Sequence, residues 1–524
     1  MNLTKKKIFC VLVILLIASV TIYSAGKKEV EQDFSEKITR GGTFTMGIMN
    51  RITSLDPANG NAYSGEGNVY PLLYDRLLRK DLSTGAYIPE LATSWEFSSD
   101  GKQLTLFLRK GVTFHDGTPF NAAAVKFNLD RSLDPTDATQ AYTYFTYVDS
   151  IEVIDDYTVR INMKQPSAVI LDALIYRGGF ILSPTAMTKY KGDYNEHPAG
   201  TGPFKFVEWI PGISLTVVKN ENYWDIGEDG QPLPYLDKIV FKVIADDSVR
   251  IVELQTGAAD LIVRVPSHSM DVVSKYPNLD LVKSITADTF RLYLNMRKAP
   301  YNNLLVRQAI NYAFDRNLMA ERLTPKQGAV HPFLYLPEDP AYSQYNPYSY
   351  DPSKAVGLLN KAGFDKGFKA DLMIIAREPD NTLAPAIQSY LEDIGIQTKI
   401  LSLERLAFVD RGISGDFDIA LAQSTIPLPS NFIFLSQQLR SDGPVNRAAW
   451  NNKEFDKLLD TLSVTNDLNT QSILLKELQK VCLDDAGQTF LFTREHYDAR
   501  HTKVHNLEFS FEGSYRLNEV WISR

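Results

Sequence analysis

Residues 89–135 constrain the fold more than any other stretch, because their pattern predicts a strand, a turn, a second strand, a second turn and a helix in that order. Their sequence is PELATSWEFSSDGKQLTLFLRKGVTFHDGTPFNAAAVKFNLDRSLDP. Leucines alternate with other residues over 104–109, after a Ser-Asp-Gly-Lys turn, which predicts a half-buried strand paired with 93–97. The HDGTP turn then leads to Asn121, whose side chain is suited to accept backbone N–H groups at a helix start. This order predicts a hairpin followed directly by a helix.

The C-terminal half carries a second clear pattern. An apolar strand at 372–376 precedes a helix whose apolar residues recur in register over 383–394, Gly395 ends that helix, and an alternating strand follows at 396–401. Strand, helix and strand in this order predict a parallel α/β sheet. In the N-terminal half, YPLLYDRLLR at 70–79 predicts an amphipathic helix.

The N-terminus has the layout of a secretory signal peptide. Lysines at 5–7 precede an apolar run at 8–20 and small residues at 24–26. The run is short for a membrane span. We therefore assign 1–26 as a signal peptide and expect cleavage near Gly26, in preference to the alternative of an uncleaved anchor.

Cysteine usage and charge narrow the class of protein further. The chain has two cysteines, Cys10 and Cys482; Cys10 lies inside the apolar run, so no lipid anchor near the cleavage site and no intramolecular disulfide are expected in the mature protein. Losing the three signal lysines moves the net charge from −8 to −11. An acidic protein argues against a nucleic-acid partner. The charged segment 27–40 is expected to be a flexible leader.

Several motifs together resemble one family. Besides 89–135, these are YDRLLRKD at 74–81, GTGPF at 200–204 and NMRKAPY at 295–301. They are similar to the signature segments of the peptide- and nickel-binding extracytoplasmic proteins of ABC importers, the family 5 solute-binding proteins. The resemblance extends over nearly all of residues 41–511.

This resemblance implies an α/β, type II periplasmic-binding-protein-like fold of cluster C, with two lobes, a hinge and an extra inserted domain. We expect lobe I to be discontinuous, from 41–70, 183–286 and 490–524. The inserted domain is expected at 71–182 and lobe II at 287–489.

The resemblance also implies a function. The chain is expected to be the periplasmic substrate-binding component of an ABC importer, capturing an oligopeptide, an oligosaccharide or a similar polar solute between its lobes. Its partners would be separate permease and ATPase subunits, the protein would be a monomer, and no cofactor and no catalytic residue are expected. A sensory or chaperone protein using the same closure remains an alternative.

A secreted hydrolase or metal-dependent enzyme is the alternative from another class. No nucleophile elbow, zinc-binding helix or phosphate-binding G-x-x-x-x-G-K motif is present in the sequence. His496, His501 and His505 are the one histidine group near the C-terminus, but their surroundings predict a strand, and surface histidines are favoured over a metal site.

Residues at strand ends and in loops are the candidates for ligand contacts. By resemblance, the loop after Asp56-Pro57 offers Asn61 and Tyr63, with ordinary turn residues as the alternative. Tyr142 lies where some peptide binders place a cleft tyrosine, or it belongs to the core of the inserted domain. Arg377 follows the 372–376 strand, where α/β sheets present ligand sites, and it would grip a carboxylate or pair with Glu378 or Asp380.

The segment DIALAQSTIPLPSNF at 418–432 bears most directly on the ligand. Peptide-binding relatives usually carry a longer loop here with Trp and Asp, and one of those acids neutralises the peptide's amino group. No acid or Trp lies between Ile419 and Phe432, and burying an ammonium without a counter-charge is costly. A neutral or hydroxyl-rich ligand contacting the candidates Ser424, Thr425 and Asn431 is therefore expected. Trp450 is a further candidate, for stacking or for packing.

Overall fold

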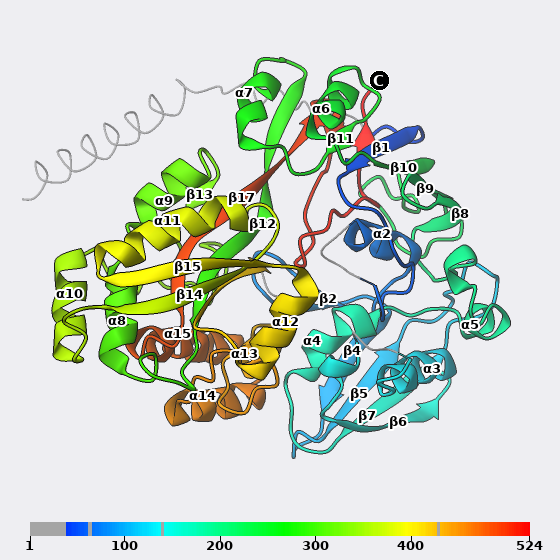
Figure 1. The fold of residues 1–524 in the computed structure, drawn as a ribbon. Coiled ribbons are helices and arrows are strands. Elements are labelled where there is room, and N and C mark those ends of the chain that lie inside the picture. Colours follow the sequence, from blue (N-terminus) through cyan, green and yellow to red (C-terminus); the bar gives the residue numbers. More distant parts are fainter. Residues whose placement is uncertain (1–37, 61–64, 138–140, 427–429) are drawn as a thin grey trace, which may run out of the picture. The chain divides into compact units, whose positions relative to one another are not determined.

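The computed structural model describes residues 38–60, 65–137, 141–426 and 430–524 (Figure 1). The predicted signal peptide, 1–26, lies outside these residues. Among the helices that are described, none combines the length and the apolar character needed to cross a membrane.

The largest sheet of the described residues is mixed and has eleven strands. Two long strands, β12 (Leu279–Leu294) and β17 (Thr489–His501), pair antiparallel at its centre. On one side follow β16 (Ile419–Ile426), β14 (Phe368–Ile375) and β15 (Ile396–Leu403); on the other follow β11 (Leu261–Ile262), β1 (Thr43–Ile48), β10 (Lys238–Val243), β9 (Ser214–Lys219) and β8 (Phe204–Ile210), while β13 (Gly328–Ala329) pairs with β17.

Lobe II contains the predicted strand, helix and strand. β14 and β15 are parallel and α11 (Asp380–Asp393) connects them, which confirms that prediction. Successive residues of β16 face opposite sides: Ile419 and Leu421 join one apolar cluster, and Ala420 and Ala422 the other. Helices therefore cover both faces, with α8 (Leu304–Tyr312), α9 (Arg316–Leu323), α10 (Pro352–Lys361) and α11 on one, and α12 (Arg405–Ser414), α13 (Asn431–Gln438), α14 (Lys453–Ser463) and α15 (Leu468–Asp484) on the other.

The inserted domain contains the predicted hairpin and helix. β4 (Ala92–Phe97) and β5 (Gln103–Leu108) pair antiparallel, in a sheet ordered β4-β5-β7-β6 that β7 (Thr158–Met163) and β6 (Val148–Asp155) complete. Asn121 accepts the backbone N–H of Ala124 at 3.0 Å, at the start of α3 (Ala122–Ser132). The leucines of β5 are buried against α3. The prediction for this segment is confirmed.

The predicted helix over 70–79 is wrong. α2 (Glu66–Leu73) ends at Leu73, and the chain continues into the short ribbon of β2 (Leu78–Lys80) and β3 (Tyr87–Pro89). The reason is tertiary, because the buried carboxylate of Asp75 is held by donors from distant segments, which fixes the chain in a non-helical path after α2. These donors are Thr201 Oγ1 at 2.8 Å, Tyr223 OH at 2.9 Å and Trp224 Nε1 at 2.8 Å.

The β12–β17 pair is interrupted where it passes between the lobes. Lys283 pairs with Tyr497 and Ala287 with Glu495, so three residues of β12 lie opposite the single residue His496. A bulge of this kind bends a strand and breaks the ladder of hydrogen bonds locally. The backbone ladder between the two connecting strands is therefore incomplete at this point.

The remaining elements are short helices, strands and turns. They are α4 (Ile170–Leu174), α5 (Pro184–Lys189), α6 (Asp247–Gln255), α7 (Met270–Val273), β18 (Val504–His505), β19 (Trp521–Ile522), and short 3₁₀ turns at Tyr142–Tyr144, Arg177–Gly179, Tyr194–Glu196 and Ser267–Ser269. Apolar residues of α6 and α7 pack on β11, and a further cluster fills lobe I around β1 and β10.

Candidate ligand-binding site

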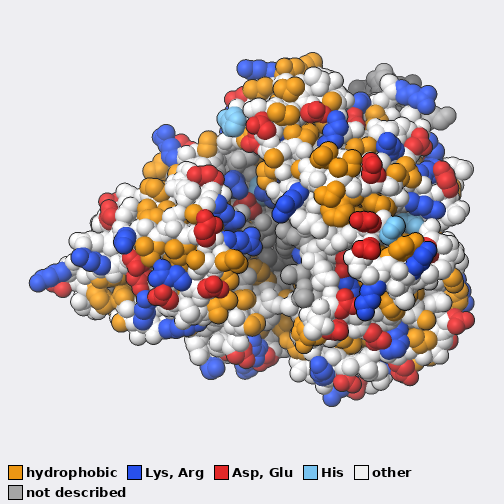
Figure 2. All heavy atoms as spheres, turned by 45° about the vertical axis from the view of Figure 1, so that its right-hand side comes forward, with side chains coloured by type: hydrophobic (Ala, Val, Ile, Leu, Met, Phe, Trp, Pro, Cys, Tyr) orange, Lys and Arg blue, Asp and Glu red, His pale blue; other side chains and the backbone are white. Residues whose placement is uncertain are grey.

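A cavity of about 520 Å³ opens at the carboxyl end of β14. Its lining comes from β12, β14, β16, the starts of α11 and α12, the end of α13 and the segment after it. The volume is in the range of about 300–1,000 Å³ usual for small-molecule sites. Ligands bind at this end of the strands in open α/β sheets. Figure 2 shows a hollow in one face of the molecule with Lys and Arg side chains at its margin.

Three of the predicted site residues meet in this cavity. Arg377, Ser424 and Thr425 all line it. The Arg377 guanidinium donates from Nη2 to Gln423 Oε1 at 3.2 Å, and its Nε lies 3.8 Å from Asp380 Oδ1. Its side chain is 43% exposed, so a ligand can still reach it. The alternative interpretation, an ion pair with Asp380, is present but long, and the binding of a ligand carboxylate by Arg377 stays a prediction.

Arginines dominate the cavity wall. Arg291, Arg377, Arg405 and Arg447 line it, and Asp380 is the single carboxylate among the lining residues. Burial raises the pKa of Asp380 above its ordinary value, and the charge of Arg377 opposes this. One carboxylate does not balance four guanidinium groups. The cavity is therefore suited to hold anionic groups.

Arg291 is the most unusual member. It is 1% exposed and donates from Nη2 to Tyr293 OH at 2.9 Å and to Gln438 Oε1 at 2.7 Å. Its Nε and Nη1 are buried without a hydrogen-bond partner, and no salt bridge to it is formed by the described residues. A buried cation without an anion is costly. The sequence indicates a buried charge at this position, because Arg291 lies inside the otherwise apolar strand segment FRLYL.

A cluster of charged residues lies at the bulge beside this cavity. Asp288 of β12 is 1% exposed and accepts from Arg494 Nη2 at 2.7 Å, while His496 Nε2 lies 2.9 Å from the same oxygen. Arg264 Nη1 is 3.6 Å away. We call Asp288, Arg494, His496 and Arg264 the hinge cluster. Thr425 donates to Asp288 Oδ1 at 2.9 Å and thereby connects the cavity to it.

The electrostatics of the hinge cluster are dominated by its cations. Burial alone would raise the pKa of Asp288, but the contact with His496 and the charges of Arg264 and Arg494 outweigh burial and hold that pKa well below its usual range. Burial lowers the pKa of His496, and Asp288 only partly opposes this. Asp288 is thus a buried anion between two guanidinium groups.

The structure places two of the other predicted residues, Tyr142 and Asn431, away from this cavity. Asn61 and Tyr63 fall outside the described residues. Tyr142 is half-buried and does not line the cavity, although its neighbour Ala141 donates a backbone hydrogen bond at 3.2 Å to Ala58, just before that undescribed stretch. Asn431 begins α13 and hydrogen-bonds the carboxyl group of Asp339.

Trp450 is not brought to the cavity. It is 1% exposed, packs edge-on against Phe455 with ring centroids 4.9 Å apart, and donates from Nε1 to Asp485 Oδ2 at 2.6 Å. Its position is explained by packing and not by stacking on a ligand.

The three histidines do not share a site. His496 belongs to the hinge cluster, the His501 ring bonds the Leu254 carbonyl, and His505 stacks on Trp521. Within the described residues no group of three His, Cys, Asp or Glu side chains is placed to hold a metal.

Fold and cavity define a two-lobed α/β binding protein with a hinge and an inserted domain. The profile of the bacterial extracellular solute-binding proteins, family 5 Middle, matches residues 86–445. The chain belongs to this family. It is therefore the substrate-binding component of an ABC importer and not an enzyme.

Similar proteins include one named for glutathione and one solved with a peptide. The glutathione-binding protein GsiB of Pectobacterium atrosepticum is 31% identical over 481 residues, which cover 86% of this chain and 89% of that protein. The periplasmic binding protein DppA of Helicobacter pylori, solved with the peptide STSA, has a TM-score of 0.75 and 29% identity, covering 93% of this chain and 99% of its own. HbpA2 of Haemophilus parasuis, at 22% identity and TM-score 0.82, covers 92% and 100% and shares the fold.

Proposed function

We propose that this protein captures a small peptide or peptide-like solute that carries free carboxylates. The observation that carries the proposal is the cavity wall, on which four arginines face one carboxylate whose pKa is raised. Buried guanidinium groups bind carboxylates in a two-pronged way. This anionic ligand differs from the neutral ligand that the segment of Ser424 and Thr425 suggested. That segment is uncharged, but arginines from other segments lie beside it in the cavity.

The relatives support this chemistry. GsiB is named for glutathione, a tripeptide with two carboxylates, and DppA was solved with a peptide. In our proposal Arg377 holds one carboxylate at the rim, and Ser424 and Thr425 offer hydroxyl groups to the peptide backbone. Arg291 lies deepest and attracts a second anionic group.

We further propose how the protein works in transport. Residues 1–26 direct export and are removed, and the mature monomer closes lobe II (287–489) on lobe I (41–70, 183–286 and 490–524), with the inserted domain at 71–182. The closed form then passes its solute to a permease driven by a separate ATPase. The bulge at His496 supports a lobe boundary near residue 286.

Native mass spectrometry and calorimetry test the solute class. We expect the mature protein, purified without refolding, to retain or bind glutathione, and to bind its diethyl ester at least about tenfold more weakly, because the ester lacks both carboxylates. Equal affinity for acid and ester, or preferential retention of a neutral sugar, would contradict the proposal.

Replacing Arg377 with Ala tests the residue assignment. Loss of a charged hydrogen bond costs about 1.5–3 kcal/mol, so glutathione should bind roughly tenfold to a hundredfold more weakly. Arg411→Ala is the matched control, because Arg411 lies on α12, pairs with Asp416 at 2.8 Å and does not line the cavity. Unchanged affinity in Arg377→Ala would remove Arg377 from the site.

A further inference from the structure

A second cavity, of about 460 Å³, lies apart from the arginine-lined one and shares no lining residue with it. Its walls are the end of α2, the β2–β3 ribbon with its turn, and the C-terminal segment 508–518. The isolated bridge between Phe509 and Tyr515 shapes that segment into a hairpin. This cavity is thus built from lobe I and the inserted domain, without lobe II.

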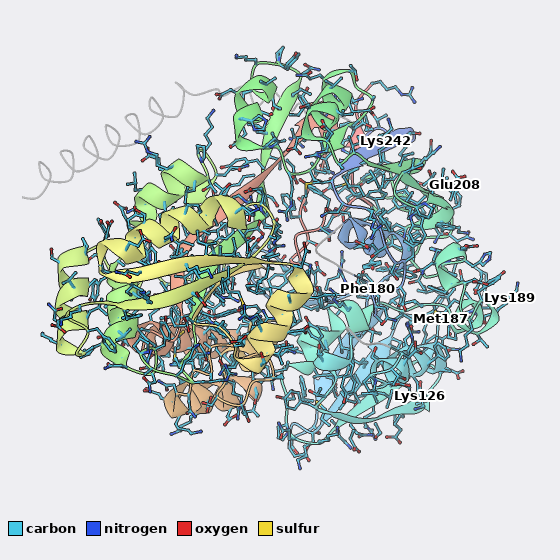
Figure 3. All side chains as sticks on the ribbon, viewed as in Figure 1. Lys126, Phe180, Met187, Lys189, Glu208 and Lys242 are labelled. Atoms are coloured by element: carbon cyan, nitrogen blue, oxygen red, sulfur yellow. The ribbon has the colours of Figure 1, made fainter. Side chains whose placement is uncertain are left out.

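Most charged groups of this second cavity are already engaged. Asp75 has its three donors, and the Asp81 carboxylate accepts from Ser83 and Thr84 within its own turn. Arg76 pairs with Glu512 at 2.5 Å and lies over the ring of Phe180, which is labelled in Figure 3. Arg516 pairs with Glu508 and Glu519. Lys80 lies 4.0 Å from Asp172.

Two charges remain, one of each sign. Glu90 is 8% exposed; one carboxyl oxygen accepts the backbone N–H of Arg76, and the other, Oε2, is buried without a partner. Arg79 Nε is also buried without a partner. Neither forms a salt bridge with any described residue, although each favours the charged form of the other, and Asp225 and Asp75 also favour the charge of Arg79. Burial raises the pKa of Glu90 to about 8, although the charges of Arg79 and Arg76 favour its ionised form.

The uncharged lining includes polar residues such as Ser510, Ser514 and Asn518, and a set of apolar side chains. Leu72, Leu82 and Ile88 come from one side, and Phe509, Phe511 and Leu517 from the other. A ligand that satisfies the cavity therefore needs a cationic group, an anionic group and an apolar body. A free α-amino acid with an apolar side chain combines all three.

We propose that this cavity is a second ligand site, which binds an apolar α-amino acid with its ammonium group at Glu90 and its carboxylate at Arg79. The site does not depend on the solute of the arginine-lined cavity. A cavity filled with water is the alternative, since water also satisfies buried polar atoms.

Calorimetry on the full mature protein with three probes at neutral pH decides between them. L-Leucine should bind, whereas leucinamide, which lacks the carboxylate, and 4-methylpentanoate, which lacks the ammonium group, should each bind at least about tenfold more weakly. No binding of leucine, or equal binding of the three, would overturn the proposal. This comparison needs no variant.

Two variants then locate the site. Glu90→Gln should abolish the preference for leucine over 4-methylpentanoate, and Arg79→Gln the preference over leucinamide. Asp81→Asn, on the same cavity wall but held in its own turn, should leave both preferences unchanged. Loss of leucine binding in Arg377→Ala but not in Glu90→Gln would place leucine in the lobe II cavity and overturn the second site.

Discussion

At the scale of single residues, Arg291 shows how a binding site can be kept at the expense of stability. Its guanidinium group is desolvated yet has two unpartnered nitrogens. Its two acceptors, Tyr293 and Gln438, also bond each other at 2.9 Å, so they do not depend on it. We therefore expect an apolar side chain at position 291 to stabilise the fold about as well as Arg291 does.

Arg291→Met should leave the free energy of unfolding unchanged or raise it by up to about 2 kcal/mol, because a buried unpaired charge is replaced by an apolar group. Glutathione affinity should fall at least about tenfold. Denaturant titration and calorimetry measure the two effects.

Arg316→Met is the contrasting variant. Arg316 is buried too, but it donates to the carbonyls of Phe490 and Asn311 at 2.7 and 2.9 Å, so its loss should destabilise the fold by about 3 kcal/mol or more. A comparable loss of stability in Arg291→Met would show that Arg291 is structural.

At the scale of elements, the hinge cluster secures the two strands that connect the lobes. Asp288 of β12 accepts a hydrogen bond from Arg494 of β17. The two residues are opposite each other in the ladder, close to the bulge that interrupts it. The ion pair thus adds a side-chain contact between the two strands next to the place where their ladder is interrupted.

Asp288→Asn should lower the free energy of unfolding by about 3–5 kcal/mol, because it removes the buried anion that Arg494, Arg264 and His496 contact. Asp280→Asn on the same strand is the control: Asp280 is 49% exposed and lies 3.7 Å from Arg500, so the change should be under about 1 kcal/mol. Equal effects in the two variants would show that the cluster is not special.

The contribution of Asp288 should also depend on pH. Its pKa is lower in the folded state than the ordinary value of about 4 in the unfolded chain. Its stabilisation is therefore complete above about pH 4 and is lost as the pH falls below that value. The stability difference between the wild type and Asp288→Asn, measured by denaturant titration, should shrink on acidification below about pH 4. A constant difference down to about pH 2 would contradict the shift.

At the scale of the whole molecule, the proposed function predicts that ligand binding and closure are coupled through lobe II. Thr425 lines the arginine-rich cavity and also a small cavity at the hinge cluster, which lobe I residues such as Asn50 and Asn68 share. A solute held on lobe II thus lies beside the contacts that change when the lobes move.

Glutathione should reduce the radius of gyration of the mature protein in small-angle X-ray scattering, because closure brings the lobes together. Arg377→Ala should need roughly tenfold to a hundredfold more ligand for the same change. An unchanged radius at saturating ligand would argue against closure.

The sequence by itself determined the locally encoded parts of this protein. The alternation over 104–109, the cap at Asn121 and the strand–helix–strand unit at 372–401 depend on periods and turn residues within a few positions, and each is confirmed. The motifs that resemble the family also predicted its membership and fold, because they are short and ordered along the chain.

Tertiary structure decided the end of α2 and the character of the site. The helix stops at Leu73 because partners near residues 201–224 hold Asp75, and no local pattern reports them. Four arginines from 291–447 converge only after β12, β14 and α12 are assembled, so the local segment at 418–432 suggested a neutral ligand. The charge of a cavity depends on all residues that are near in space. When these residues are far apart in the sequence, no local segment indicates the total charge.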